Sequence, residues 1–555
     1  MSRRRITCAA ALATLLVTGS CLPATATSDS GDPIAITVDV NAERHPISPL
    51  IYGVSFGDAA TLADLRGPVN RAGGNSASLY DWRSEARNAG RDWYFESLPI
   101  APDDRSQYGT RFVERSRAGG AAAMLTVPMT GWAATLGPDG GKRASFALSR
   151  YGAQETHDGN GFADAGNGLR PDGTPITGND PTDAARRTNR DEQQDWVRSL
   201  VARWGSAADG GVRFYAMDNE PSRWHDIHRD VRPVGLHARE LAAMVVDYAK
   251  AVKAVDPSAR IVAPEEWGWN GYRYSGFDQQ IGDAHGYDDL PDRRDQTGGM
   301  DVLPWLLTQW RAAGHPVDVV SVHYYPQGGE YRENGDDVSP RMQRLRNRST
   351  RSLWDPEYRD TSWIDDKIML IPRLREWVSR YYRAGTPLAI TEYNWGGERH
   401  MNGATAQADI LGIFGREGLY MANRWVAPAR GTPTYLAMKL YRNYDGQGAG
   451  FGETSVAARS PDPDAVATFA AVRARDGALT IVAINKRLDR VTPVVLSLAG
   501  YGLAGTVEGA RLARGTLAPL ATARFEAGRF SATLPMQSVT MFVLKPTTLG
   551  KKHGR

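Results

Sequence analysis

Cysteine is almost absent from this chain. Its two cysteines, Cys8 and Cys21, both lie within the first 26 of 555 residues. That segment has the features of an export signal, with arginines at 3–5, an apolar stretch over 6–17 and a small-residue cleavage site at 24–26. We expect cleavage there, which leaves a mature chain without cysteine that folds without disulfides. The alternative is a lipid anchor on Cys21.

Net charge and long apolar runs are also lacking. The formal charge of +3 falls to zero once the arginines at 3–5 are removed. A neutral chain has no electrostatic footprint for nucleic acid. No run after the signal is long enough to cross a membrane. We therefore expect a secreted protein, periplasmic or extracellular, that is monomeric, binds no nucleic acid and leaves the membrane after signal cleavage.

Nucleotide-binding motifs are absent too, since no GxGxxG or P-loop follows the first apolar run. Instead, eight short apolar runs each end in polar or aromatic residues, as buried parallel strands do. These runs are 50–56, 67–75, 121–129, 213–220, 260–269, 317–325, 388–394 and 419–428. Helical patterns between them cover 191–205, 237–256, 302–314 and 364–385. The alternation predicts an α/β fold, a closed (β/α)8 TIM-like barrel, over residues 49–445.

The pattern changes near the C-terminus. A last helix is expected over 434–444, and short alternating strands separated by turn residues follow it, as in an antiparallel β-sandwich. These strands are 465–475, 478–487, 491–499, 505–514, 529–534 and 538–545. We assign the sandwich to 446–547 and a flexible tail to 548–555. Residues 33–41 also alternate, so we expect the segment 27–48 to add a strand to the sandwich.

Two glutamates lie where predicted barrel strands end. Glu220 ends the fourth strand and Glu392 the seventh. Catalytic groups of such barrels lie at the carboxyl ends of the strands. A pair of carboxylates beside aromatic rings is what hydrolysis of a glycosidic bond requires. Glu265 and Glu266, at the end of the fifth strand, are competing candidates for the acid.

Further polar and aromatic residues near the strand ends are candidate substrate ligands. Asn219 precedes Glu220, and the Tyr325 hydroxyl is placed to hydrogen-bond Glu392. The full candidate set is Asn75, Asn219, His323, Tyr325, Trp224, Trp269, Trp395 and Trp425. Flat indole rings stack on sugar faces, although for any one of these tryptophans core packing is the alternative. A core histidine is likewise the alternative for His323.

A long segment after the third strand, 131–190, has little apolar periodicity. Loops of this length in compact domains are usually functional, so we interpret it as one wall of a cleft. We expect no organic cofactor. Carboxylates and amides of this segment are candidate ligands for a structural Ca²⁺ ion, although no EF-hand spacing is present. They are Asp158, Asp164, Asn167, Asp172, Asn179 and Asp180.

Several segments together resemble glycoside hydrolase family 44. They are FYAMDNEPSRWHDIH (214–228), RIVAPEEWGWNGY (260–272), DVVSVHYYPQ (318–327), LAITEYNWGG (388–397) and ANRWVAP (422–428). The resemblance implies a retaining endo-β-1,4-glucanase or xyloglucanase with a barrel and a sandwich built from both chain ends. It also implies that Glu220 is the acid/base and Glu392 the nucleophile.

We therefore predict a secreted enzyme that cleaves the β-1,4-linked backbone of soluble or amorphous cellulose or xyloglucan. A β-mannanase or xylanase on the same barrel is the alternative within the enzyme class. A catalytically silent glycan-binding protein is the alternative outside it. A metal-dependent hydrolase built on His225, His228 and His323 lacks the ligand spacing of known zinc motifs.

Overall fold

The structure is a computed structural model that describes residues 32–101, 108–331 and 335–546. The predicted signal peptide, the alternative anchor at Cys21 and the tail at 548–555 lie outside these residues. Within them, no helix combines the length and the apolar character needed to cross a membrane.

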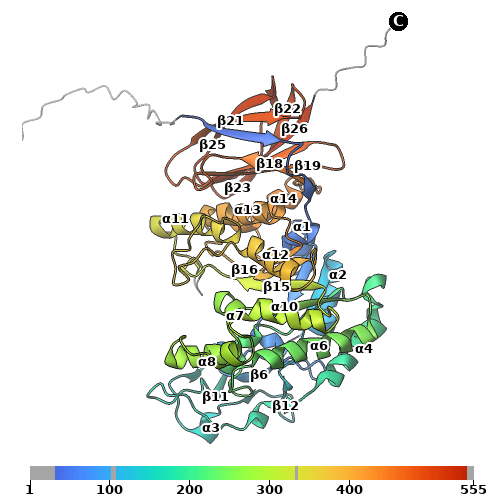
Figure 1. Ribbon diagram of the computed structural model, residues 1–555, viewed down its shortest axis with the longest axis vertical. Coiled ribbons are helices and arrows are strands. Elements are labelled where there is room, and N and C mark those ends of the chain that lie inside the picture. The colour runs from blue at the N-terminus through green and yellow to red at the C-terminus, as the bar shows by residue number, and fades with distance from the viewer. Residues whose placement is uncertain (1–31, 102–107, 332–334, 547–555) are drawn as a thin grey trace, which may run out of the picture.

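Eight parallel strands close into a barrel, which confirms the predicted fold class (Figure 1). Each strand falls within one of the eight apolar runs. They are β3 (Gly53–Ser55), β4 (Val69–Ala72), β7 (Ala122–Val127), β13 (Phe214–Met217), β14 (Arg260–Glu266), β15 (Val319–Tyr324), β16 (Leu388–Tyr393) and β17 (Met421–Arg424). The order around the barrel is β13-β14-β15-β16-β17-β3-β4-β7, so the ends of all eight strands open onto one face.

Helices cover the barrel where amphipathic periodicity predicts them. In α6 (Ala238–Val255) the residues Leu241, Val245, Tyr248 and Val252 are buried along one side. Four other predicted helices are present as α4 (Arg190–Trp204), α10 (Val302–Ala312), α12 (Leu370–Tyr381) and α14 (Pro433–Asn443). The remaining helices around the barrel include α1 (Ala59–Leu65), α2 (Gly109–Ala118), α5 (Trp224–Ile227), α7 (Trp269–Arg273), α8 (Gly276–His285), α9 (Pro291–Asp295) and α11 (Pro340–Ser349).

Helix α13 (Met401–Arg416) follows β16 and was not predicted. It lies between the barrel and the sandwich and contacts β19, β20 and β26 as well as α14 (Figure 1). Every residue from Asn402 to Gly415 is buried. A helix enclosed on all sides has no polar stripe, so the periodicity that identifies surface helices is missing from its sequence.

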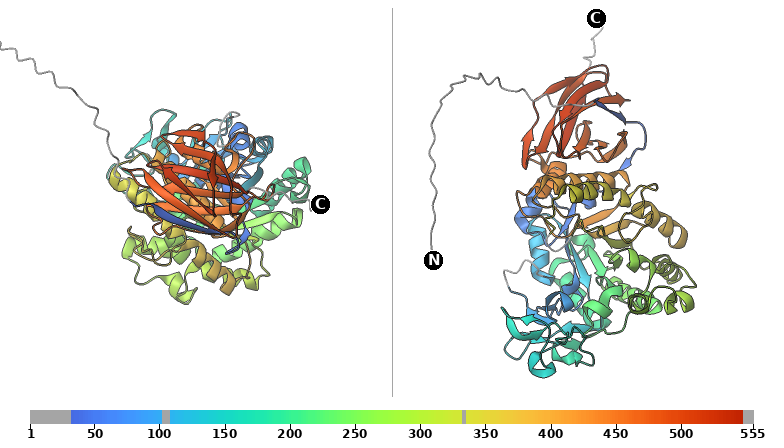
Figure 2. Two further views of the ribbon diagram at one scale, coloured as in Figure 1. Left: turned by 90° about the horizontal axis from the view of Figure 1, so that it is seen from above. Right: turned by 90° about the vertical axis from the view of Figure 1, so that its left-hand side faces the viewer.

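The predicted sandwich is present as a sheet of mostly antiparallel strands that come from both chain ends (Figure 2). Strand β1 (Ile34–Asp39) pairs in parallel with β21 and antiparallel with β18. The other strands are β2 (His45–Pro46), β18 (Thr454–Arg459), β19 (Val466–Val472), β20 (Leu479–Asn485), β21 (Thr492–Ala499), β22 (Gly505–Ala513), β23 (Thr516–Pro519), β24 (Ala523–Phe525), β25 (Arg529–Leu534) and β26 (Ser538–Pro546). Residues from both halves of this sheet, such as Ile36 and Phe542, share one apolar cluster, as in a sandwich.

The segment 131–190 folds into short pieces at the end of the molecule away from the sandwich (Figure 1). Strand β8 (Trp132–Ala134) pairs with β12 (Ala185–Arg187), and β10 (His157–Asp158) pairs with β11 (Phe162–Gly166). Strand β9 (Arg143–Ala144) joins β5 (Ala86–Asn88) and β6 (Glu96–Pro99), and α3 spans Leu148–Tyr151. The long segment after β7 is therefore an ordered subdomain, packed beside the segment that follows β4.

Candidate active site

The backbone after β13 turns sharply and presents Glu220. Asp218 and Glu220 have φ angles of 61° and 44°, in the left-handed region that residues other than glycine rarely adopt. The Asp218 carboxylate holds this turn, since it accepts hydrogen bonds from Ser78 Oγ at 2.5 Å and from the Asn219 amide at 2.7 Å. The Glu220 amide donates to the carbonyl oxygen of Glu265 at 3.0 Å. Backbone strain of this kind clusters at functional sites.

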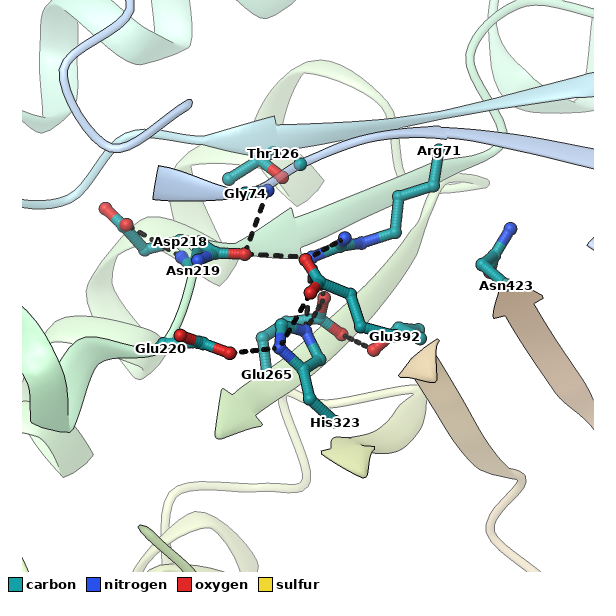
Figure 3. A network of polar contacts seen from close by, with 12 residues as sticks. Arg71, Gly74, Thr126, Asp218, Asn219, Glu220, Glu265, His323, Glu392 and Asn423 are labelled. Atoms are coloured by element: carbon teal, nitrogen blue, oxygen red, sulfur yellow. Dashed lines mark hydrogen bonds and ion pairs between the residues drawn. The ribbon is translucent and has the colours of Figure 1, made fainter. Parts of the chain in front are cut away.

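His323, on β15, connects three of the acids. Its Nδ1 lies 2.8 Å from Glu220 Oε1, and its Nε2 lies 3.3 Å from Glu265 Oε2 (Figure 3). Burial alone would lower the pKa of His323. The negative charge of Glu392 and the hydrogen bonds with Glu220 and Glu265 outweigh burial and raise this pKa to about 9. At neutral pH the ring is therefore a cation whose two nitrogens both donate.

Arg71, on β4, lies at the centre of the site and is completely buried. Its Nη1 donates to Glu392 Oε1 at 2.6 Å, and its Nη2 donates to Glu265 Oε2 at 2.9 Å (Figure 3). Nη2 also lies 3.1 Å from Asn219 Oδ1. We did not identify Arg71 from the sequence, although an arginine inside an apolar strand was an available signal.

Glu265 is not placed to donate a proton to a substrate. Burial raises the pKa of its carboxyl, but the charges of Arg71 and His323 and the hydrogen bond from His323 outweigh burial and lower it to about 2. Thr391 Oγ1 donates to its other oxygen at 2.7 Å. Glu265 is thus a permanently ionised partner of Arg71 with no exposed surface.

Glu266, the other competing acid, is also buried. Its Oε2 accepts a hydrogen bond from Ser222 Oγ at 2.6 Å. Burial raises the pKa of Glu266 to about 8, and the Ser222 hydrogen bond offsets only part of this rise. Glu266 is therefore neutral at pH 7 and unavailable to substrate.

This burial gives a testable pH dependence of stability. Between pH 4.5, the ordinary pKa, and pH 8, the folded chain keeps a proton on Glu266 that the unfolded chain has lost. The stability from this proton is complete below pH 4.5 and is lost as the pH rises to 8. As the pH rises through this range, we expect the free energy of unfolding of Glu266→Gln to increase relative to that of the parent by about 1 kcal/mol per pH unit. Urea unfolding at pH 5 and pH 8 measures it, and parallel pH dependences would contradict it.

The two predicted catalytic acids face each other from opposite sides of the site. The Glu220 side chain is 17% exposed and the Glu392 side chain 6% exposed. One carboxylate oxygen of each and a ring nitrogen of His323 all lie within 4.8 Å of one another. Tyr325 donates its hydroxyl to Glu392 Oε2 at 2.9 Å, the contact expected from the sequence.

Three of the four tryptophans assigned to sugar binding are in the core instead. Trp224, Trp269 and Trp395 are at most 5% exposed and belong to the main apolar cluster, so their rings have no free face for a sugar. Trp425 remains partly exposed and packs edge-on against Phe56. The core-packing alternative therefore holds for the three buried rings.

Asn75 lies beside the catalytic residues, as expected. Its Oδ1 accepts a hydrogen bond from Asn219 Nδ2 at 3.1 Å, and its Nδ2 donates to Asp92 Oδ2 at 2.7 Å. His228 Nε2 is 3.1 Å from the Asn75 carbonyl oxygen. The polar network of the site thus extends from Asn219 to the segment that follows β4.

Two exposed tryptophans that the sequence analysis did not identify lie in loops that follow barrel strands. Trp93 is 48% exposed and Trp363 is 53% exposed. Trp93 follows Asp92 in the loop after β4. Trp363 donates its Nε1 to Gln327 Oε1 at 3.2 Å, in the loop after β15 that also carries Tyr325. Strands β4 and β15 are four positions apart in the eight-stranded barrel, so the loops that carry these rings leave it on opposite sides.

The aspartates among the candidate calcium ligands form no group of three or more possible metal ligands within the described residues. Within the described residues, the only group of three possible metal ligands is Glu220, His323 and Glu392, without His225 or His228. Asp164, Asp172 and Asp180 instead accept hydrogen bonds from nearby backbone amides and hydroxyls of serine or threonine. Their arrangement stabilises turns and gives the calcium hypothesis no support.

Comparisons with known proteins agree with this architecture. A model of glycoside hydrolase family 44 matches residues 86–328. Endoglucanase A of Paenibacillus lautus is 33% identical over 531 residues, which are 90% of this chain and 70% of that protein. The crystal structure of CelM2, a bifunctional glucanase-xylanase protein from a metagenome library, superposes with a TM-score of 0.89 at 52% identity, covering 93% of this chain and 99% of CelM2. A Paenibacillus polymyxa xyloglucanase gives a TM-score of 0.74 at 29% identity, covering 93% and 100%. This chain therefore belongs to glycoside hydrolase family 44.

Proposed function

We propose that this protein is a secreted endo-β-1,4-glucanase that acts with retention of anomeric configuration. The proximity of Glu220 and Glu392 is the observation that carries the proposal, because their nearest oxygens lie within 4.8 Å. Retaining glycosidases hold their two carboxyl groups about 5–5.5 Å apart, whereas inverting enzymes separate them by about 6.5–9.5 Å to admit water.

In the first step Glu392 attacks the anomeric carbon and Glu220 protonates the leaving oxygen. Arg71 and Tyr325 donate to the two oxygens of Glu392 and hold the carboxylate in position. Glu220 and His323 are joined by a 2.8 Å hydrogen bond, which fixes the position of the Glu220 carboxyl group. In the second step Glu220 removes a proton from water, and that water hydrolyses the glycosyl-enzyme.

The substrate we propose is a soluble or amorphous β-1,4-glucan, including xyloglucan. Named relatives support this class, among them an endoglucanase and a xyloglucanase. Xylanase or mannanase activity is the second candidate, because CelM2 is called a glucanase-xylanase and another relative a β-mannanase/endoglucanase. This chain is 29% identical to the latter and spans 35% of its length.

Reducing-sugar release from xyloglucan, carboxymethylcellulose, lichenan, glucomannan and xylan tests the proposal. We expect the highest rate on one of the β-glucans. A higher rate on xylan or glucomannan would favour the second candidate. Absence of hydrolysis, together with binding to any of them, would favour a silent glycan-binding protein.

Trp93 and Trp363 provide a test of how the glucan lies across the site. We propose that each ring stacks on a sugar unit away from the cleaved bond, on opposite sides of the catalytic pair. Loss of one aromatic ring that contacts a sugar costs a few kcal/mol at most. We expect Trp93→Ala and Trp363→Ala each to raise KM for xyloglucan about 5- to 50-fold and to leave turnover of a short aryl cellobioside nearly unchanged. Equal effects on both substrates would contradict this role.

A further inference from the structure

One buried carboxylate close to Glu220 in the sequence has no part in the two chemical steps. Asp218 directly follows β13, two residues before Glu220, and none of its surface is exposed to solvent. Its side chain extends away from Arg71 and Glu392 (Figure 3). A substrate therefore cannot contact Asp218, so any role of this residue in catalysis is indirect.

The Asp218 carboxylate joins the segments that follow three barrel strands. Its Oδ1 accepts hydrogen bonds from Ser78 Oγ at 2.5 Å, in the loop after β4, and from the Asn219 amide at 2.7 Å, after β13. Its Oδ2 accepts a hydrogen bond from the amide of Met129, which follows β7. Strand β7 pairs with β4 on one side and with β13 on the other. One carboxylate therefore holds the ends of three adjacent strands in register.

This arrangement needs two acceptor oxygens on residue 218. Burial raises the pKa of Asp218 to about 6, and the hydrogen bonds from Ser78, Met129 and Asn219 offset part of the rise, so the group is ionised at neutral pH. The change Asp218→Asn keeps the shape of the side chain but replaces one acceptor oxygen with an NH2 donor. Whichever way the new amide faces, the N–H of Met129 or that of Asn219 loses its acceptor.

The backbone held by Asp218 carries Glu220. Both residues have left-handed φ angles, 61° and 44°, and such backbone persists only where the surrounding contacts hold it. Asn219, between them, is fixed through its side chain as well, since its Oδ1 accepts a hydrogen bond from the Gly74 amide at 3.0 Å. Loss of an acceptor at Asp218 therefore lets the backbone of Glu220 shift without removing any group that lines the cleft.

We propose that Asp218 is a positioning residue for proton transfer, which holds the Glu220 carboxyl group where it can protonate the leaving oxygen. The inference rests on the acid/base role proposed for Glu220. Misplacement of a reacting group by about 1 Å can lower a rate about 100-fold. The nucleophile Glu392 is held by Arg71 and Tyr325 instead, so it keeps its position. Loss of Asp218 therefore impairs protonation and leaves nucleophilic attack intact.

The dependence of the rate on the leaving group tests this role. We expect Asp218→Asn to lower kcat/KM about 10- to 100-fold for phenyl cellobioside, whose leaving oxygen needs a proton. For dinitrophenyl cellobioside, which needs little protonation, the loss should stay below about threefold. Asp230→Asn is the matched control, because Asp230 is also buried and accepts a hydrogen bond from Ser145 Oγ at 2.6 Å. In this control the ratio of the two rates should equal that of the parent.

Ser78→Ala decides the question if Asp218→Asn does not fold. It removes one of the three hydrogen bonds and should change the ratio of the two rates in the same direction. Equal losses on both substrates, or no loss on either, would overturn the proposal.

Glu220→Gln separates this inference from the proposed function. It should show the same selective loss on phenyl cellobioside, and a larger one. If Glu220→Gln shows this loss and Asp218→Asn does not, only the role of Asp218 is wrong. If Glu220→Gln loses both activities equally, the acid/base role of Glu220 is refuted and the role of Asp218 falls with it.

Discussion

Glu392→Gln and Glu220→Gln should each lower kcat by several orders of magnitude on a natural glucan. General acid catalysis alone contributes about 10²–10⁴-fold, and loss of a covalent nucleophile costs at least as much. Both changes nearly preserve side-chain volume, so oligosaccharide binding and the unfolding midpoint should change little. Initial rates on carboxymethylcellulose or xyloglucan measure the effect. Glu266→Gln, also buried nearby, is the control and should keep most of the activity; an equal loss there would contradict our assignment of the acid.

The alanine variants of the two acids, Glu220→Ala and Glu392→Ala, should differ on an activated substrate. A good leaving group needs little protonation, so Glu220→Ala should still form the glycosyl-enzyme on Glu392. Azide needs no general base and should then restore turnover and give a β-glycosyl azide. The same addition to Glu392→Ala should give no β-product, because no covalent intermediate exists there. A β-glycosyl azide from Glu392→Ala would contradict the role of nucleophile that we assign to Glu392.

Arg71→Met should have the largest effect on stability. The change leaves Glu265 and Glu392 as buried carboxylates without their shared cation. Removing one partner from a buried ion pair costs about 3–5 kcal/mol. We expect a loss of that size in urea unfolding, together with a fall in kcat of at least about 100-fold, because Glu392 loses its 2.6 Å donor.

Two other variants test whether the effect of Arg71 depends on its forked guanidinium and on its burial. Arg71→Lys should recover only part of the stability, since one ammonium cannot reproduce the fork that reaches both acids. Arg186 also bridges two acids, Asp81 and Glu192, but it is partly exposed, and exposed pairs contribute about 0–1 kcal/mol. Equal losses from Arg71→Met and Arg186→Met would contradict the role we give to burial.

The barrel could be predicted from sequence because each of its strands is buried and ends abruptly in polar residues. The run before Glu220 and the run before Glu392 have this form, and their order alone places both acids on one face. Helix α13 could not be predicted in the same way, because burial on all sides removes the amphipathic signal.

Side-chain direction was the main part of the site that the sequence could not provide. Trp224 and Trp395 follow barrel strands closely, yet both turn into the core. Trp93 and Trp363 lie in long loops and remain exposed. Which way an indole faces depends on tertiary packing rather than on its distance from a strand end. The position of Arg71 between two acids likewise depends on contacts between strands far apart in the sequence.

The anomeric form of the first product tests the central claim most directly. Two successive displacements at the anomeric carbon, through a covalent bond to Glu392, return it to its original configuration. Proton NMR of the earliest products of cellopentaose or xyloglucan hydrolysis, before mutarotation, distinguishes the two anomers. We predict the β-anomer. Initial release of the α-anomer would show a single displacement by water and would contradict a covalent intermediate on Glu392.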